Sequence, residues 1–308
     1  MYHFIINPKS SSGRGIRFWW LVKDELEQRK IEYTEVFTER VGHATELTKD
    51  ICRNNPGIKN IVIVGGDGTV NEVINGIDNF DEVLLGYVPS GSSNDLARGL
   101  KLPNDPVEAL DHILKPTKFQ YLDHGEITFP DKDLAPHRFT CSSGIGYDAS
   151  VCYEVQESPL KRSLNRFGIG KFVYIAIAIK QVLTAPYMST TIILDDVRQI
   201  TYQNVLLVSN MIHKYEGGGL LMAPDADPTD GKLSITLVHG LSKAKVFLLL
   251  PTIFNGTHVK HYGVDTFHCN KIEIKTDTDI AVHTDGEIPA ICSHITATCI
   301  PGKLRMIL

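Results

Sequence analysis

The sequence predicts two domains of the α/β plus all-β class: an N-terminal parallel α/β domain and a C-terminal antiparallel, β-sandwich-like domain. In residues 1–117 a strand-like run, a loop and a helix-like pattern repeat along the chain, and this alternation is typical of a parallel sheet covered by helices. From 118 to 296, short alternating runs are separated by turn residues, which favours antiparallel strands. The chain has 308 residues, 43% of them hydrophobic, so both domains can form cores.

Strands of the first domain are expected where apolar residues form short runs, because such runs suit strands buried on both faces. These runs lie at 2–6, 33–37, 61–64 and 83–88. The helices between them show apolar residues at helical spacing. The expected buried faces are Ile16, Trp19, Trp20 and Leu26; Ala44, Leu47 and Ile51; and Val70, Val73, Ile74 and Ile77. A short helix near Asp95 and another at 106–114 follow, and the domain boundary is expected at 115–118.

The second domain is expected to consist mostly of short strands, with helical stretches near 168–184 and 242–254. Its strand-like runs include TTIILDD, ITYQNVLLVSN, GKLSITLVHG and HITATCI. Two Asp-Gly pairs, Asp285-Gly286 and Asp230-Gly231, lie between apolar runs and have the form of plain turns.

Composition excludes several classes of function. The formal net charge is −5, so nucleic acid is not an expected partner. The six cysteines form no C-x-x-C pair, and the twelve histidines show no metal-binding spacing, so we expect free thiols and no zinc site. The N-terminus lacks the features of a signal peptide, and the apolar runs are shorter than a membrane span. These features favour a cytoplasmic protein that touches membranes only peripherally.

One segment offers such a contact. Residues 158–181 carry Lys161, Arg162, Arg166 and Lys171 beside an apolar run, and this combination suits an anionic membrane surface. The alternative is a helix that packs on the second domain and exposes its basic end to solvent. The sequence leaves both interpretations open.

Four loops follow the strands of the first domain: NPKSSSG, TERVGH, GGDGTVNE and PSGSSND. In an open α/β sheet, ligands bind beyond the carboxyl ends of the strands. Gly, Ser, Thr and Asn residues let backbone N–H groups point inward, which suits a phosphate. Neither common nucleotide-binding fingerprint occurs in these loops. A structural alternative exists for GGDGTVNE, in which Thr69 and Glu72 form a capping box and Asp67 is only a turn residue.

The combination of these segments resembles a known family. GGDGTVNEVINGI and VPSGSSNDLARGL, with INPKSSSGRG, GGGLLMAPDADPTDGKL and the late DGE, resemble the diacylglycerol kinase catalytic domain and its soluble bacterial lipid kinases. The resemblance covers nearly the whole chain, with the motifs in the family's order. It implies that the first domain binds nucleotide, that the chain returns to it at about 297–308, and that the site lies in the cleft between the domains.

The resemblance also assigns residues to an ATP site and its Mg²⁺. The residues that would line the ATP site are Asn7, Pro8, Ser10, Ser11, Ser12, Thr38, Gly65, Gly66, Asp67, Gly68, Thr69, Asn71, Glu72, Ser92 and Asn94. Glu287 would be the general base, and Asp285 would support the site or a catalytic Mg²⁺, for which Asp67 is a second candidate. A separate structural Mg²⁺ would bind the side chain of Asp230 beside the backbones of Asp227 and Lys232.

The predicted function is an ATP- and Mg²⁺-dependent lipid kinase that phosphorylates the hydroxyl of diacylglycerol or a related lipid. The alternatives are a kinase for a soluble acceptor, such as NAD or a sugar phosphate, and a non-catalytic nucleotide- or lipid-binding protein. The sequence does not select among lipids. It also leaves the oligomeric state open, although an exposed strand edge in the second domain could pair in a homodimer.

Overall fold

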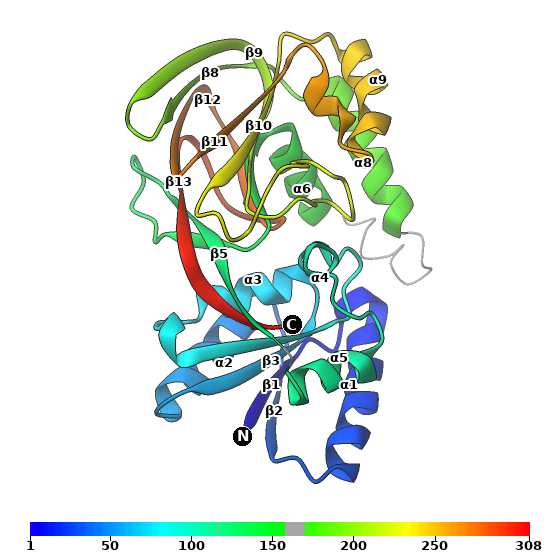
Figure 1. Ribbon diagram of the computed structural model, residues 1–308. Helices are drawn as coiled ribbons and strands as arrows, with labels where there is room; N and C mark the ends of the chain where they lie inside the picture. Colours follow the sequence, from blue (N-terminus) through cyan, green and yellow to red (C-terminus); the bar gives the residue numbers. More distant parts are fainter. Residues whose placement is uncertain (117, 158–169) are drawn as a thin grey trace. The chain divides into compact units, whose positions relative to one another are not determined.

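A computed structural model describes residues 1–116, 118–157 and 170–308 (Figure 1). The chain forms two compact units. The first comprises Met1–His124 together with Pro301–Leu308, and the second comprises Gly125–Ile300. The last strand, β13 (Glu287–Ile307), therefore contributes residues to both units.

The first unit is built on a parallel sheet, as predicted. Its strands are β1 (Tyr2–Ile6), β2 (Tyr33–Phe37), β3 (Lys59–Gly65) and β4 (Val83–Pro89), in the spatial order β2-β1-β3-β4. All three pairings are parallel. The end of β13 adds a further parallel strand beside β4, where Met306 is the partner of Leu85.

Helices cover both faces of this sheet (Figure 1). α1 (Ser10–Gln28) and α5 (Pro106–Leu114) pack together on one face, and α2 (His43–Asn54) and α3 (Asp67–Asn75) pack together on the other. The short elements η1 (Phe80–Glu82) and α4 (Asp95–Leu100) flank β4. The predicted buried face of α1 is partly wrong, because Trp19 is fully buried against Phe4 whereas the side chain of Trp20 is 56% exposed.

The second unit is β-rich, as predicted. β9 (Arg198–Met211), β7 (Ser142–Gly146) and β12 (Lys271–Thr284) pair antiparallel in that order, and β13 pairs antiparallel with β12. β10 (Leu233–His239) and β11 (Val264–Cys269) extend the sheet beyond β9. β8 (Met188–Leu194) pairs with both β9 and β12. β5 (Phe119–Thr128) pairs with β6 (His137–Phe139).

Within the described ranges, the second unit contains the helices α6 (Tyr147–Glu157), α8 (Gly170–Thr184) and α9 (Lys243–Ile253) and the short 3₁₀ segment η3 (Thr257–Lys260). α8 and α9 agree with the predicted helical stretches, but α6 begins where the sequence pattern indicated strands. No helix within the described ranges is both long and apolar enough to cross a membrane.

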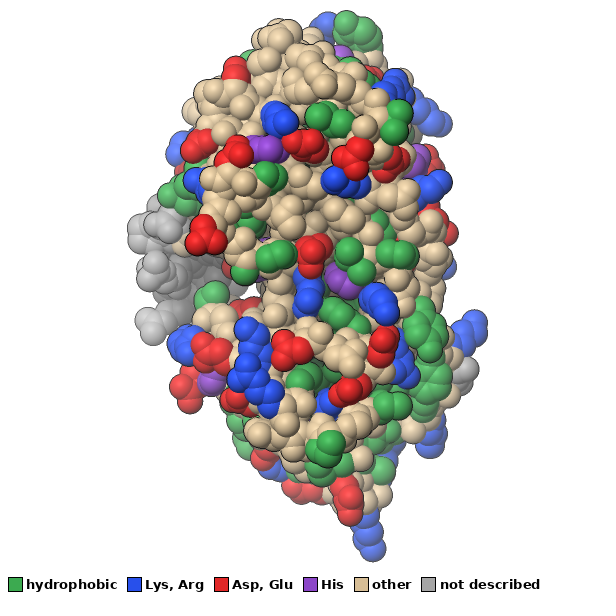
Figure 2. All heavy atoms as spheres, turned by 90° about the vertical axis from the view of Figure 1, so that its left-hand side faces the viewer, with side chains coloured by type: hydrophobic (Ala, Val, Ile, Leu, Met, Phe, Trp, Pro, Cys, Tyr) green, Lys and Arg blue, Asp and Glu red, His purple; other side chains and the backbone are tan. Residues whose placement is uncertain are grey.

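The basic segment predicted as a membrane contact is only partly described. Lys161, Arg162 and Arg166, and the side chain of Lys171, lie outside the described residues. Elsewhere on the surface, Figure 2 shows one face on which acidic and basic side chains are interspersed. No extended area of a single charge is visible among the coloured residues of that face.

Candidate functional site

The loops at the carboxyl ends of β1, β3 and β4 contact one another directly. Asn7 donates from its side-chain amide to Thr69 Oγ1 over 3.0 Å, and the hydroxyls of Ser10 and Ser90 are 2.7 Å apart. The backbone N–H of Ser90 donates to the carbonyl of Gly65 over 2.7 Å. Three of the four loops that the sequence singled out are thus held together at one end of the sheet.

Glycines are required where two of these loops meet. A Cβ placed on Gly66 would lie 2.9 Å from the Cα of Gly91, and one on Gly91 would lie 2.5 Å from the Cα of Gly66. Real Cβ atoms do not approach backbone this closely, so either substitution forces the loops apart. Asn94, which has a left-handed backbone (φ 50°), fixes the same corner by donating to the carbonyl of Gly91 over 3.2 Å.

Asp67 stabilises the neighbouring loop and helix. Its carboxylate accepts the backbone N–H groups of Asp95 over 3.0 Å and of Leu96 over 3.2 Å. These are the first residues of α4, whose N–H groups have no partners within the helix. Asp67 therefore ties the corner after β3 to the helix that follows β4.

The capping box considered for Thr69 and Glu72 does not form. Gly66 is the N-cap residue of α3 and makes no side-chain cap bond. Glu72 instead accepts the backbone N–H of Ala44 over 2.9 Å at the start of α2. Glu72 therefore supports α2, whereas Thr69 binds Asn7 in the loop cluster.

The remaining predicted residues of this unit lie close by in the chain. Ser11 and Ser12 both have left-handed backbones and, with Gly13, interrupt the first turn of α1. Thr38 donates its backbone N–H to the carbonyl of Ile6 over 2.8 Å, and Lys9 Nζ donates to the carbonyl of Glu39 over 3.1 Å. The loop after β2 is therefore connected to the loop after β1. Pro8, Gly68 and Asn71 belong to the same loops and to the first turns of α3, and Asn71 is buried.

A pocket of about 340 Å³ opens beside the loop after β4. Its lining includes the predicted residues Ser92 and Asn94, together with Arg14, Arg98 and Lys101. Three cationic side chains around one pocket suit a phosphate-bearing ligand. These three cations were not among the residues predicted from sequence. Arg14 and Arg98 lie within the segments INPKSSSGRG and VPSGSSNDLARGL, and Lys101 directly follows the second of them.

In the second unit, Asp285 and Gly286 form the two-residue turn between β12 and β13, as predicted. Both have positive φ, 49° and 89°, which is characteristic of a type I′ hairpin. The carboxylate of Asp285 accepts the backbone N–H groups of Thr140, Cys141 and Ser142 over 2.7 to 3.0 Å, and also the hydroxyl of Thr140. These contacts anchor the turn to the segment that leads into β7.

Glu287 follows this turn and is half-buried. The side-chain amide of Gln156, on α6, donates to Glu287 Oε2 and to the carbonyl of Gly286, both over 3.0 Å. Gln156 thereby orients the carboxylate from outside the hairpin. Sequence reasoning missed it, because α6 itself was not predicted and the two residues are 131 positions apart.

The turn predicted to hold a structural Mg²⁺ is compact. Asp230 accepts the backbone N–H of Lys232 over 2.9 Å, and the N–H of Asp230 faces the carbonyl of Asp227 at 3.4 Å. Asp227 Oδ1 accepts the N–H and hydroxyl of Thr229. Carboxylate and carbonyl oxygens at an exposed turn are the ligands that Mg²⁺ prefers, so this donor set fits the ion.

Comparison with known proteins identifies both parts of the chain. Residues 1–126 match the diacylglycerol kinase catalytic domain, and residues 141–308 match the YegS C-terminal NAD kinase beta sandwich-like domain. A Bacillus subtilis protein named "Putative lipid kinase YtlR" is 32% identical over 99% of this chain and 98% of its own length. A Mycobacterium tuberculosis diacylglycerol kinase is 26% identical over 93% of this chain and 91% of its own.

The fold agrees with these sequence matches. A solved structure described as a diacylglycerol kinase from Bacillus anthracis superposes with a TM-score of 0.70 at 19% identity, covering 99% of this chain and 96% of that one. The family predicted from the quoted segments is confirmed. The chain belongs to the diacylglycerol kinase catalytic-domain family and carries a C-terminal domain of the YegS type.

Proposed function

We propose that this protein is an ATP- and Mg²⁺-dependent lipid kinase that transfers the γ-phosphate of ATP to the hydroxyl of diacylglycerol or a related lipid. The observation that carries the proposal is the loop cluster of the first unit, in which Gly66 and Gly91 approach too closely for any side chain. Beside it lies the pocket with Arg14, Arg98 and Lys101. Small loops of this kind bring backbone N–H groups to a phosphate, and the cations balance its charge.

Glu287 is proposed as the general base. A carboxylate accepts the proton of the acceptor hydroxyl. The hydroxyl oxygen attacks the γ-phosphorus at the same time, and ADP departs. Such a group must be held in a fixed orientation, and Gln156 together with the Asp285 turn supports that requirement. We assign supporting roles to Asp285 and Asp67, since each uses both carboxylate oxygens to accept backbone N–H groups.

Mg²⁺, when bound, would neutralise charge on the transferred phosphoryl group. For the separate structural ion we propose the Asp230 turn, where Asp230 offers a carboxylate and the backbones of Asp227 and Lys232 are adjacent. The oxygen-only donor set of this turn is the basis of that assignment.

A lipid acceptor requires access to an apolar interface. α8 and α9 contact each other and expose Ile179, Leu183 and Leu248, whose exposed fractions are 41%, 60% and 77%. Phe254, directly after α9, is 69% exposed. Large apolar side chains at the surface of neighbouring helices support contact with lipid rather than with a soluble metabolite.

The test is ³²P transfer from labelled ATP, with Mg²⁺, into a total lipid extract and separately into a soluble metabolite pool. Label is expected in a chloroform-soluble product. Glu287→Gln should lower the rate by roughly 10²-fold or more, since general-base catalysis contributes on this scale. Gln156→Ala leaves the Glu287 carboxylate in place but removes the side chain that orients it, and we expect the rate of transfer to fall about tenfold. Asp277→Asn, which changes an exposed carboxylate of β12, is the matched control and should retain full activity.

The other outcomes separate the alternatives. Label only in the aqueous pool would indicate a kinase for a soluble acceptor. ATP binding without transfer to either pool would favour a binding protein. Full activity in Glu287→Gln would reject the general-base assignment while leaving the kinase itself in place.

A further inference from the structure

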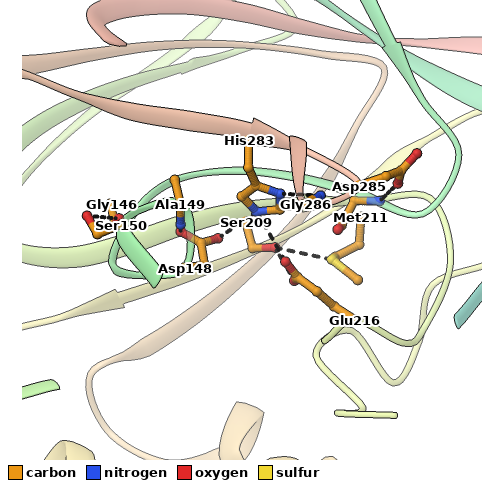
Figure 3. A network of polar contacts seen from close by, with 11 residues as sticks. Gly146, Asp148, Ala149, Ser150, Ser209, Met211, Glu216, His283, Asp285 and Gly286 are labelled. Atoms are coloured by element: carbon orange, nitrogen blue, oxygen red, sulfur yellow. Dashed lines mark hydrogen bonds and ion pairs between the residues drawn. The ribbon is translucent and has the colours of Figure 1, made fainter. Parts of the chain in front are cut away.

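Three side chains of the metal-binding type converge in the second unit, beside the Asp285–Gly286 turn (Figure 3). Asp148 lies in the first turn of α6, Glu216 follows β9, and His283 lies near the end of β12. His283 Nε2 is 3.3 Å from Asp148 Oδ2 and 3.1 Å from Glu216 Oε1. The three donor atoms all lie within 4.8 Å of one another.

The cluster carries a charge that these side chains alone do not balance. The exposed fractions of the His283, Asp148 and Glu216 side chains are 1%, 8% and 14%. Within the part of the chain that the structure describes, each of the two carboxylates forms an ion pair with His283 and with no other side chain. A protonated imidazole would still leave one buried negative charge, and buried charges are ordinarily paired or bound to a metal.

The surroundings hold the two carboxylates in place. The backbone N–H of Ala149 donates to Asp148 Oδ1 over 2.8 Å, and the hydroxyl of Ser209 faces Glu216 Oε2 at 3.3 Å. The other oxygen of each carboxylate is thereby directed at Nε2. Hydrogen bonds to the outer oxygens of ligating carboxylates are typical of metal sites.

Gly144, on β7, leaves the room that the Asp148 carboxylate and the His283 ring occupy. A Cβ at this position would lie 1.9 Å from Asp148 Oδ2 and 2.7 Å from His283 Nε2. Any side chain larger than hydrogen would therefore displace the donor atoms.

We propose that Asp148 Oδ2, Glu216 Oε1 and His283 Nε2 bind a divalent transition-metal ion of the Zn²⁺ class. A neutral imidazole, two carboxylates and a divalent cation have zero net charge. Donor atoms about 2.0–2.2 Å from such an ion lie about 3.0–3.5 Å apart, which agrees with the two distances to Nε2. The nitrogen ligand favours Zn²⁺ over Mg²⁺, and distinguishes this site from the Asp230 turn.

The rival is a proton on His283. Burial lowers the pKa of His283, but hydrogen bonds to Asp148 and Glu216 outweigh it and raise that pKa well above its ordinary value. The N–H of Gly286 faces Nδ1 at 3.4 Å, the long limit of a hydrogen bond. An N–H that donates to Nδ1 fits a ring whose proton is on Nε2. Metal binding at Nε2 and protonation of the ring both place a proton on Nδ1, so either one would replace this long contact.

The experiment measures Zn²⁺ binding to the full chain after removal of metals with a chelator. Titration against a fluorescent zinc indicator, in excess Mg²⁺, gives affinity and stoichiometry. Wild type should bind a single Zn²⁺ tightly, and His283→Gln and Glu216→Gln should bind it roughly 100-fold more weakly or worse. His294→Gln is the matched control. His294 also contacts two carboxylates, but Asp131 faces Nδ1 and Glu273 faces Nε2. The two carboxylates therefore lie at different atoms of the ring and could not bind one metal ion together with a single ring nitrogen.

Two further measurements, thermal unfolding of each variant and the change in melting temperature with Zn²⁺, separate the proposal from loss of folding and from kinase activity. Thermal unfolding shows whether each variant is folded. If His283→Gln does not fold, Glu216→Gln, which changes the more exposed ligand, replaces it in the test. Zn²⁺ should raise the melting temperature of wild type and of His294→Gln only. Equal Zn²⁺ affinity in wild type and folded Glu216→Gln would overturn the proposal, as would an equal loss in His294→Gln. Failure of phosphate transfer to lipid would not affect it.

Discussion

At the scale of single residues, three carboxylates bind backbone N–H groups of segments distant in the sequence. Asp67 accepts the first N–H groups of α4, Asp285 accepts those of Thr140, Cys141 and Ser142 at the start of β7, and Glu72 accepts the N–H of Ala44. Each carboxylate comes from a different segment than the groups it holds. A charged acceptor makes a stronger hydrogen bond than a neutral one, so a few acidic residues can fix several loops.

A buried histidine predicts how stability depends on pH. His258 is buried, and its ring faces the carbonyl of Met222 at 3.1 Å. Burial, above all, lowers the pKa of His258. As pH falls through the ordinary histidine pKa of about 6.5, the unfolded chain binds a proton that the folded protein resists. The free energy of unfolding contributed by this residue should therefore decrease as pH falls.

Denaturant unfolding between about pH 7 and pH 5 checks this prediction. His258→Gln retains an amide that can donate to Met222 but does not titrate, so its stability should fall less steeply towards acid. His112→Gln, at an exposed position on α5, is the control and should follow wild type. Identical slopes for wild type and His258→Gln would show that another group determines the acid sensitivity.

At the scale of elements, α4 depends on a cap supplied by a distant residue. Asp67 caps α4 across 28 positions, whereas Asp105 caps α5 locally by accepting the N–H groups of Val107 and Glu108. Removing either cap should cost about 0.5–2 kcal/mol of stability. Only Asp67→Ala should also weaken ATP binding, because it releases α4 from the loop cluster and moves Arg98.

The comparison of Asp67→Ala with Asp105→Ala separates stability from function. We expect both to lower the melting temperature by a similar amount. The KM for ATP should rise at least about tenfold in Asp67→Ala, which corresponds to about 1.4 kcal/mol of lost binding, and stay near wild type in Asp105→Ala. A similar rise in both would mean that destabilisation alone explains the effect of Asp67.

Elements with a strong local signal were predictable from sequence. β1 and β2 match their expected bounds, because an apolar run between polar turns has few alternatives in a buried parallel sheet. α6 was missed because its segment, YDASVCYEVQE, has little apolar periodicity and directly follows a strand. Trp20 was predicted to be buried but is exposed, because its neighbour Trp19 fills the core position. Two adjacent tryptophans do not show in the sequence which of them faces the core.

The candidate sites also contain some residues that were predictable from sequence and some that were not. Loops that follow predicted strands could be placed together, because parallel strands bring their carboxyl ends to one edge. The partner of Glu287 and the Asp148–Glu216–His283 cluster could not be predicted in this way. Their members come from α6, from the segment after β9 and from β12, so no spacing along the sequence reveals them. The expectation of no zinc site rested on such spacing, and the proposed metal site departs from it.

At the scale of the whole molecule, the net charge of the protein and the charge of the proposed substrate ATP have the same sign. The protein carries a formal charge of −5, and ATP is also strongly negative. Binding must therefore depend on a local field, for which Arg14, Arg98 and Lys101 are the candidates. Local and net effects can be separated by two double variants that remove the same charge from different places.

The variants are Arg98→Gln with Lys101→Gln, in the pocket, and Lys271→Gln with Lys303→Gln, which break exposed ion pairs with Asp196 and Asp81. The pocket variant should raise the KM for ATP roughly tenfold or more, since hydrogen bonds to charged groups contribute about 1.5–3 kcal/mol. The surface variant should change it less than about twofold, because exposed pairs contribute little. Salt should weaken ATP binding to wild type more than to the pocket variant, as ions screen the local cations beyond about 8 Å at physiological strength. If both variants raised the KM equally, net charge would control binding; if neither did, the phosphates would have to bind away from this pocket.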